Sequence, residues 1–199
     1  MQLLAPVTIA IGAALMMASS AFAAPQPVAV AATSVPALKD ATIYRSGTGC
    51  SQCPNSDCNQ CTLGTSTTLS ASLGARSLVQ SIIGFQLPYD GSLVKTCTIQ
   101  IPAFSKPNTV PVTITINNAE HKDWSDATIN GANAPAVWSQ VTSVTIPAYA
   151  NAGPIDISTA CRNAQRGSFS VYFSSPGTEY SFWSKESGNP AILTFTPYV

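Results

Sequence analysis

The chain has 199 residues, of which 45% are hydrophobic and only 9% are charged, with a formal net charge of +0. This balance argues against a nucleic-acid-binding protein, which carries a basic surface, and against a polybasic protein of the membrane surface. The high apolar content also argues against disorder. Ser, Thr, Asn and Gln therefore supply most of the polarity, which leaves few groups for acid–base chemistry.

The N-terminus has the pattern of a secretory signal peptide. Residues 1–24 contain no charged side chain, and a mainly apolar run from Leu3 to Met17 is followed by the A-x-A motif Ala21-Phe22-Ala23. The run is shorter than the roughly 20 residues of a membrane-spanning helix, which disfavours the alternative of an uncleaved anchor. We therefore predict a signal peptide over residues 1–23 and a secreted, extracellular product that has no membrane association after cleavage.

Residues 24–39 are rich in Ala, Pro and Val and show no clear period of 2 or 3.6. We interpret them as a leader strand or a tether. A cleaved propeptide is an alternative, although no dibasic site supports it. A single domain is predicted over residues 40–199.

Four cysteines lie within a short polar segment. Cys50, Cys53, Cys58 and Cys61 form a C-x2-C-x4-C-x2-C pattern, which in a cytosolic protein would indicate a zinc or iron–sulfur site. Thiols oxidise outside the cell, so we predict two disulfides within this cluster, with the connectivity left open and metal binding as the alternative. The bonds would staple a segment that has too few apolar residues to fold by burial.

Hydrophobic and polar residues alternate through most of the remaining chain. The alternating segments are 41–45, 67–71, 79–87, 93–101, 109–117, 143–146, 169–173, 180–182 and 191–195. Pro111, on the outward set of its segment, predicts an edge position. A short helix is expected within 156–165. The pattern predicts an all-β fold, a two-sheet antiparallel jelly-roll β-sandwich stapled by disulfides, with at most one short helix.

The remaining cysteines, Cys97 and Cys161, are far apart in the sequence. Cys97 shares one strand face with Ile99 and Ile101, and this apolar face is expected to point into the core. We predict a Cys97–Cys161 disulfide, which on the chain-entropy argument stabilises the fold by about 4 kcal/mol.

Several short segments follow one another in an order found in a known family. They are Asp40-Ala41-Thr42-Ile43-Tyr44, Ile83-Gly84-Phe85-Gln86-Leu87-Pro88, Trp124-Ser125-Asp126-Ala127-Thr128-Ile129-Asn130 and Phe182-Trp183-Ser184-Lys185-Glu186-Ser187. Residues 40–199 thus resemble the disaggregatase-related, DNRLRE-type domain, a jelly-roll module also classed among carbohydrate-binding modules. The chain departs from that family at Lys185, where Arg is usual, and at the cysteine cluster, which replaces a short Gly/Asn-rich loop.

The resemblance implies a non-catalytic module whose partner is a polysaccharide or cell-wall glycan, and we expect a monomer. Sugar rings stack on aromatic faces while nearby polar groups bond their hydroxyls. The predicted ligand-binding residues are Trp124, Trp138, Trp183, Tyr44 and Asp126. Trp124 lies in a charged loop, so its side chain is expected to be exposed.

Signs of catalysis are few. His121 is the only histidine, no Gly-x-Ser-x-Gly motif is present, and no spacing singles out a pair of carboxylates. We therefore predict no enzymatic activity and no cofactor. A structural calcium ion held by Asp40 and Glu186 is an alternative. Two other functions stay open: a structural or adhesive protein of an extracellular surface or matrix, and a secreted effector or inhibitor that binds another protein.

Overall fold

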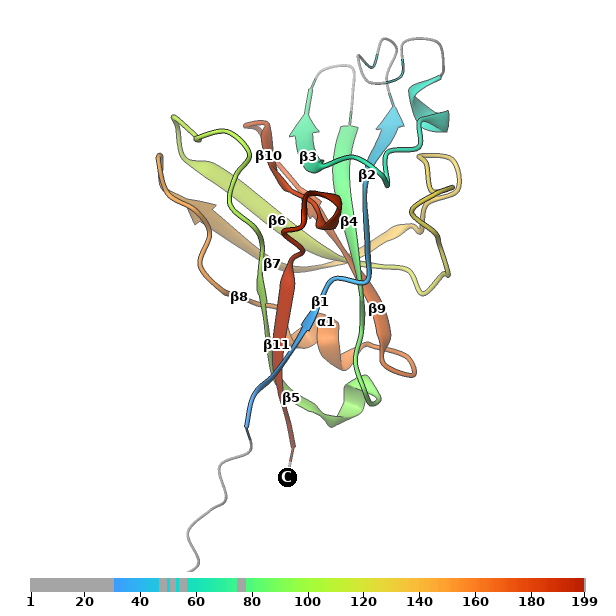
Figure 1. Cartoon of the computed structure of the whole chain (residues 1–199), viewed down its shortest axis with the longest axis vertical. Coiled ribbons are helices and arrows are strands. Elements are labelled where there is room, and N and C mark those ends of the chain that lie inside the picture. Colours follow the sequence, from blue (N-terminus) through green and yellow to red (C-terminus); the bar gives the residue numbers. More distant parts are fainter. Residues whose placement is uncertain (1–30, 47–49, 51–52, 54–56, 75–77, 199) are drawn as a thin grey trace, which may run out of the picture.

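The computed structural model describes residues 31–46, 50, 53, 57–74 and 78–198. The predicted signal peptide, residues 1–23, and the first part of the predicted leader lie outside the described residues. The described chain forms two antiparallel β-sheets (Figure 1).

The smaller sheet has the strand order β1-β11-β5-β8. Its strands are β1 (Thr33–Pro36), β11 (Ile192–Pro197), β5 (Val94–Gln100) and β8 (Ile155–Asp156). β1 comes from the segment interpreted as a leader strand or tether, and it pairs with β11 at the edge of this sheet. The sandwich therefore includes residues that precede residue 40.

The larger sheet has the order β10-β3-β4-β9-β6-β7, and β2 also pairs with β4. Its strands are β2 (Lys39–Ser46), β3 (Thr68–Leu73), β4 (Leu78–Gln86), β6 (Val112–Ala119), β7 (Val137–Ile146), β9 (Ser168–Ser174) and β10 (Tyr180–Trp183). The edge position predicted from Pro111 is wrong, because β6 lies between β7 and β9. Pro111 precedes the first residue of β6, so its missing N–H removes no bond within the strand.

The main hydrophobic core fills the space between the sheets. The alternation of the strands accounts for it: Ile83 and Phe85 of β4 point inward, and Phe173 of β9 meets Phe182 of β10 with ring centroids 5.6 Å apart. One short α-helix, α1 (Ser158–Arg162), and the 3-10 turns η1 (Cys58–Gln60), η2 (Gly91–Leu93) and η3 (Lys185–Ser187) complete the described elements. The predicted all-β sandwich with one short helix is confirmed.

All six cysteines are paired. The bonds are Cys50–Cys58, Cys53–Cys61 and Cys97–Cys161, and no free cysteine remains. Cys97 is buried on the inner face of β5, and its bond joins this strand to α1. The three predicted disulfides are confirmed, and the connectivity that the sequence left open is now defined.

A second hydrophobic cluster lies on the outer face of the larger sheet. It joins Ala41 and Ile43 of β2, Ile82 of β4 and Tyr172 of β9 with residues of the connection between β6 and β7. The Tyr172 hydroxyl donates a hydrogen bond of 2.7 Å to the carbonyl of Pro135 in that connection. These contacts hold residues 120–136 over the outer face and so create the wall of the site described next.

Candidate functional site

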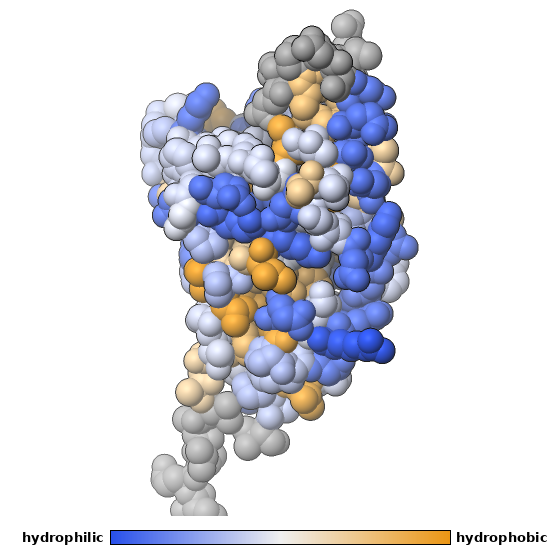
Figure 2. Space-filling view, turned by 45° about the vertical axis from the view of Figure 1, so that its right-hand side comes forward, coloured by the Kyte–Doolittle hydropathy of each residue, from blue (hydrophilic) through white to orange (hydrophobic). Residues whose placement is uncertain are grey.

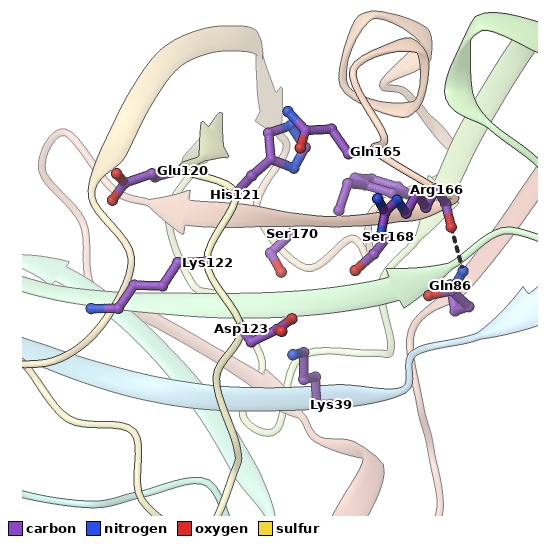
Figure 3. A pocket seen from close by; sticks show the side chains of 11 residues that line it. Lys39, Gln86, Glu120, His121, Lys122, Asp123, Gln165, Arg166, Ser168 and Ser170 are labelled. Atoms are coloured by element: carbon purple, nitrogen blue, oxygen red, sulfur yellow. Dashed lines mark hydrogen bonds between the residues drawn. The ribbon is translucent and has the colours of Figure 1, made fainter.

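A hollow of about 500 Å3 lies on the outer face of the larger sheet, against the connection between β6 and β7. Figure 2, which brings the right-hand side of Figure 1 forward, shows hydrophilic residues gathered along the right-hand part of this face. We call this hollow the groove. Its charged or titratable lining residues are Lys39, Glu120, His121, Lys122, Asp123 and Arg166 (Figure 3).

Uncharged polar side chains form much of the rest of the groove. Gln86 ends β4, Gln165 precedes β9, and Ser168 and Ser170 lie on β9. Strand alternation places Ser168 and Ser170 on the same face, so both hydroxyls point to the groove while Phe169 between them is buried in the core. The groove therefore combines hydroxyls and amides with charges of both signs.

Lys39 is fixed in the floor of the groove. Its aliphatic stem crosses the strand at Gly84, where a Cβ atom would lie only 2.9 Å from Lys39 Cγ and Cε. Its ammonium donates a hydrogen bond of 2.8 Å to the Trp124 carbonyl and lies 4.5 Å from the centroid of the Trp124 ring. Burial lowers the pKa of Lys39, while Asp123 and Asp126 act in the opposite direction. The result is a positioned cation beside the polar wall.

Arg166 stands at one end of the groove in an unusual backbone conformation. Gln165 and Ser168 exchange two backbone hydrogen bonds of 3.0 and 2.9 Å, so Arg166 and Gly167 form a two-residue turn with φ of 51° and 80°. Such turns need the left-handed conformation at both positions and favour Asn-Gly. The side chain of Arg166 is exposed and forms no hydrogen bond or ion pair with the described residues. It is thus free to contact a ligand.

A smaller, more apolar hollow of about 350 Å3 adjoins the groove. Glu120 and His121 line both hollows, and Ala136, Val137 and Trp138 complete the smaller one. Trp138 lies near the start of β7 and is 67% exposed. An exposed indole beside a polar groove offers a flat apolar face next to hydrogen-bonding groups.

The sequence of this chain matches a known family. The profile of carbohydrate-binding module family 96 matches residues 55–196. The chain belongs to this family. It is also 43% identical over 159 residues to a protein of Arthroderma benhamiae described as an uncharacterized secreted protein, a match that covers 79% of this chain and 82% of the relative. The predictions of a carbohydrate-binding module and of secretion are confirmed at this level. No described helix is long and apolar enough to cross a membrane.

In this family 96 module, Trp124 is not the exposed ring that its charged loop suggested. The side chain is half-buried against the second hydrophobic cluster. Its Nε1 donates a hydrogen bond of 3.1 Å to Ser170 Oγ, and the Lys39 ammonium lies over the ring. The expectation of exposure is corrected, because strands distant in sequence supply the apolar contacts that the neighbours of Trp124 lack. Its role in ligand contact stays a prediction.

None of the five predicted ligand residues lines the groove itself. Trp138 lines the adjoining hollow, and Trp124 contacts two groove residues, Lys39 and Ser170. Trp183 of β10 is 37% exposed. Tyr44 is half-buried on β2, where burial raises the pKa of its hydroxyl. Asp126 forms an ion pair of 2.7 Å with Lys185 Nζ. Only Trp138 and Trp124 are brought to the groove region.

Asp40 and Glu186, the residues considered for calcium, lie near the same lysine. Asp40 is buried and accepts a hydrogen bond of 2.8 Å from the Lys185 N–H, while Lys185 Nζ contacts Glu186. Burial raises the pKa of Asp40 to about 6. Ca2+ takes six to eight oxygen ligands, but no group of three or more His, Cys, Asp or Glu in the described part of the chain is arranged to hold a metal ion. The calcium alternative stays an untested prediction.

Most groove residues were not singled out from the sequence. Lys39, Gln86, Ser168 and Ser170 are ordinary strand residues whose meeting depends on the register of β2, β4 and β9. Arg166 had a local signal, since Arg-Gly stands between the short helix and a strand and Gly is typical of two-residue turns. The charged stretch around Trp124 was recognised, but its relation to the sheet was not.

Proposed function

We propose that this chain is a secreted, non-catalytic family 96 module that binds an extracellular polysaccharide in the groove, with Trp138 as the stacking residue. The observation that carries the proposal is the juxtaposition of an exposed indole with a polar groove of about 500 Å3 on a family 96 sandwich. We also propose that the module is of the disaggregatase-related, DNRLRE type, on the motif order of residues 40–199.

The charges of the groove favour an acidic polysaccharide. Lys39, Lys122 and Arg166 bring three cations, against the carboxylates of Glu120 and Asp123. Guanidinium groups bind carboxylates through charge-assisted, often bidentate hydrogen bonds. Arg166 has no competing protein partner among the described residues, whereas Lys39 and Lys122 donate to the carbonyls of Trp124 and Asn133. Arg166 is therefore the cation best placed to meet a uronate.

Some side chains and backbone groups that line the groove are already held in position before a ligand binds. The Lys39 stem is fitted over Gly84, and Gln86 Nε2 donates a hydrogen bond of 3.0 Å to the Arg166 carbonyl. Groups that are already positioned lose little conformational freedom on binding, which improves affinity without further contacts. No group of three or more His, Cys, Asp or Glu among the described residues is arranged to hold a metal ion, which is compatible with binding alone.

The test compares two polysaccharides that differ chiefly in charge. The mature protein is run in native gels that contain either polygalacturonate or fully methyl-esterified pectin. We expect retardation by polygalacturonate that weakens in high salt, since salt screens charges at exposed sites. Arg166→Asn should reduce the retardation, whereas Arg162→Asn, which removes an exposed cation on α1 outside the groove, should not.

Each alternative function predicts a different result. A structural or adhesive protein would migrate equally in gels with and without polysaccharide, and so would an effector that binds another protein. This result should hold for a wider panel of polysaccharides that includes cellulose, chitin and mannan. An enzyme would release new reducing ends from the retained polysaccharide over time. Retardation that is unaffected by Arg166→Asn and by Trp138→Ala would refute the groove as the binding site.

A further inference from the structure

A second set of hollows lies at one end of the sandwich, away from the groove. They measure about 360 and 230 Å3 and share Phe104, Pro107 and Asn108. Their walls come from residues 103–110, which connect β5 with β6, and from residues 149–151, which connect β7 with β8. The larger hollow is also lined by residues 178–181, at the end of the connection between β9 and β10 and the start of β10. Figure 1 shows these connections together at the upper left, whereas the 120–136 connection lies on the right.

An exposed tyrosine with a left-handed backbone marks this end. Tyr149 has a φ of 60° and is 76% exposed. A bulky residue other than Gly rarely adopts this conformation, which costs free energy and persists only where the surroundings impose it. The Tyr149 N–H donates a hydrogen bond of 2.7 Å to the Asn108 carbonyl, and Asn108 Nδ2 donates one of 2.9 Å to the Pro147 carbonyl. The two connections thus hold the strained residue in place.

The ring of Tyr149 is largely exposed and is not part of the hydrophobic core. Among the described residues its hydroxyl has no hydrogen-bond partner, so neither core burial nor a hydroxyl bond explains the strained backbone. Strained residues of this kind cluster at ligand sites, where the conformation presents a side chain to the ligand. The backbone of Tyr149 therefore displays a flat aromatic face at the rim of the 230 Å3 hollow.

Two amides beside the ring are also fixed, and each has a free polar group. Asn151 Oδ1 accepts a hydrogen bond of 3.1 Å from the Phe104 N–H, which leaves its Nδ2 as a donor without a partner among the described residues. Asn108 is bound through Nδ2, which leaves its Oδ1 as an acceptor. Phe104 is itself held edge-to-face against Tyr180, with ring centroids 6.1 Å apart.

We propose that this end of the sandwich is a second carbohydrate site, in which Tyr149 stacks on a neutral hexopyranose and Asn108 and Asn151 bond its hydroxyls. The adjoining hollow has one cation, Lys106, and one carboxylate, Glu179, whereas the groove has three cations against two carboxylates. The site therefore lacks the excess of positive charge by which the groove favours an acidic sugar. The inference rests on the proposed function in taking a carbohydrate as ligand. It adds a second, chemically different site, so that one module joins two polysaccharide chains.

Residue-specific nitration of tyrosine tests this site directly. Tyr149 and Tyr198 are 76% and 56% exposed, whereas Tyr172 is fully buried, so tetranitromethane should modify the first two and spare the third. We expect cellohexaose, chitohexaose or mannohexaose to slow the nitration of Tyr149 at least threefold, because a sugar stacked on the ring shields it from the reagent. The nitration rate of Tyr198 should be the same with and without the sugar. Equal nitration of Tyr149 with and without all three sugars would overturn the inference.

Variants separate this inference from the proposed function. Tyr149→Phe keeps the ring and should bind the protective hexasaccharide as the wild type does. Tyr149→Asn removes the ring but suits the left-handed backbone, so it should fold normally and lose about tenfold in affinity, the magnitude expected for a stacking contact. Arg162→Asn, outside both sites, serves as the control.

The outcomes are distinct. Loss of hexasaccharide binding in Tyr149→Asn with retardation by polygalacturonate retained supports two sites. Retardation by polygalacturonate without any hexasaccharide effect at Tyr149 overturns the second site and leaves the groove proposal intact. A wild-type protein that responds to neither class of sugar overturns both.

Discussion

The substitution Arg166→Asn should raise the free energy of unfolding of the protein and at the same time lower its affinity for polygalacturonate. Arg166 has a φ of 51° in a two-residue turn, and the left-handed conformation costs an ordinary L-residue roughly 1–2 kcal/mol. Asn visits this conformation readily. Because the Arg166 side chain forms no hydrogen bond or ion pair with the described residues, its removal forfeits no contact that stabilises the fold.

The expected gain in the free energy of unfolding is about 1 kcal/mol, which for a domain of this size raises the melting temperature by about 2–4 °C. The backbone bonds of the turn persist in the variant, since the Arg166 N–H donates to Asp90 and its carbonyl accepts from Gln86. Loss of an exposed cation from the groove removes on the order of 1 kcal/mol of attraction to a polyanion. Affinity for polygalacturonate should therefore fall about fivefold at low salt.

Thermal denaturation and affinity electrophoresis of the same samples measure both quantities. Arg162→Asn is the matched control, because it removes the same charge from a helix and relieves no left-handed strain. It should leave affinity unchanged and the melting temperature unchanged or slightly lower. A lower melting temperature in Arg166→Asn, or unchanged retardation at low salt, would show that Arg166 is neither strained nor part of the binding surface.

Three further predictions concern stability. Burial raises the pKa of Asp40 to about 6 from its ordinary value of 3.8, so between these pH values the folded protein holds a proton that the unfolded chain has lost. The stability of the fold should therefore fall as the pH rises from about 4 to about 6. In melting curves recorded across this range, Asp40→Asn should flatten the pH dependence. Trp124→Ala should lower the free energy of unfolding by about 2 kcal/mol, less than the roughly 3–5 kcal/mol expected for a fully buried Trp. Trp138→Ala, at an exposed position, should have the melting temperature of the wild type but should no longer be retarded by polysaccharide in native gels. Replacing Cys97 and Cys161 together by Ala should cost about 4 kcal/mol in urea denaturation; a loss under 1 kcal/mol would contradict the chain-entropy argument.

Local pattern was sufficient for the class of fold. Alternation with a period of two identifies which residues of a strand face the core, and this requires no knowledge of the neighbouring strands. The buried positions of Cys97, Ile99 and Phe173 followed from it. The even number of cysteines and the signal-like N-terminus likewise led to disulfides, but the pairing inside the cluster depends on which sulfur atoms the local turns bring together.

The groove depended on long-range register. Lys39, Gly84 and Ser170 are adjacent only because β2 and β9 pair on opposite sides of β4, and nothing in their local sequence indicates this. The burial of Trp124 could not be predicted from local sequence either. Its sequence neighbours are charged, so its ring was expected to be exposed. The outer-face cluster that half-buries it contains Ala119 and Ile129 from nearby in the chain, but its other buried members lie about 40 residues or more away, such as Ile82 and Tyr172.

The sequence by itself therefore determined the periodicity of the strands, the number of disulfides and the broad class of carbohydrate-binding module, since these depend on residue type and spacing. The tertiary structure alone decided which side chains meet on the outer face and which aromatic rings remain accessible. Burial of a side chain is a property of everything packed around it, so Trp138 and Tyr149 could be distinguished from Trp124 only when the two sheets and the connections over them were placed together.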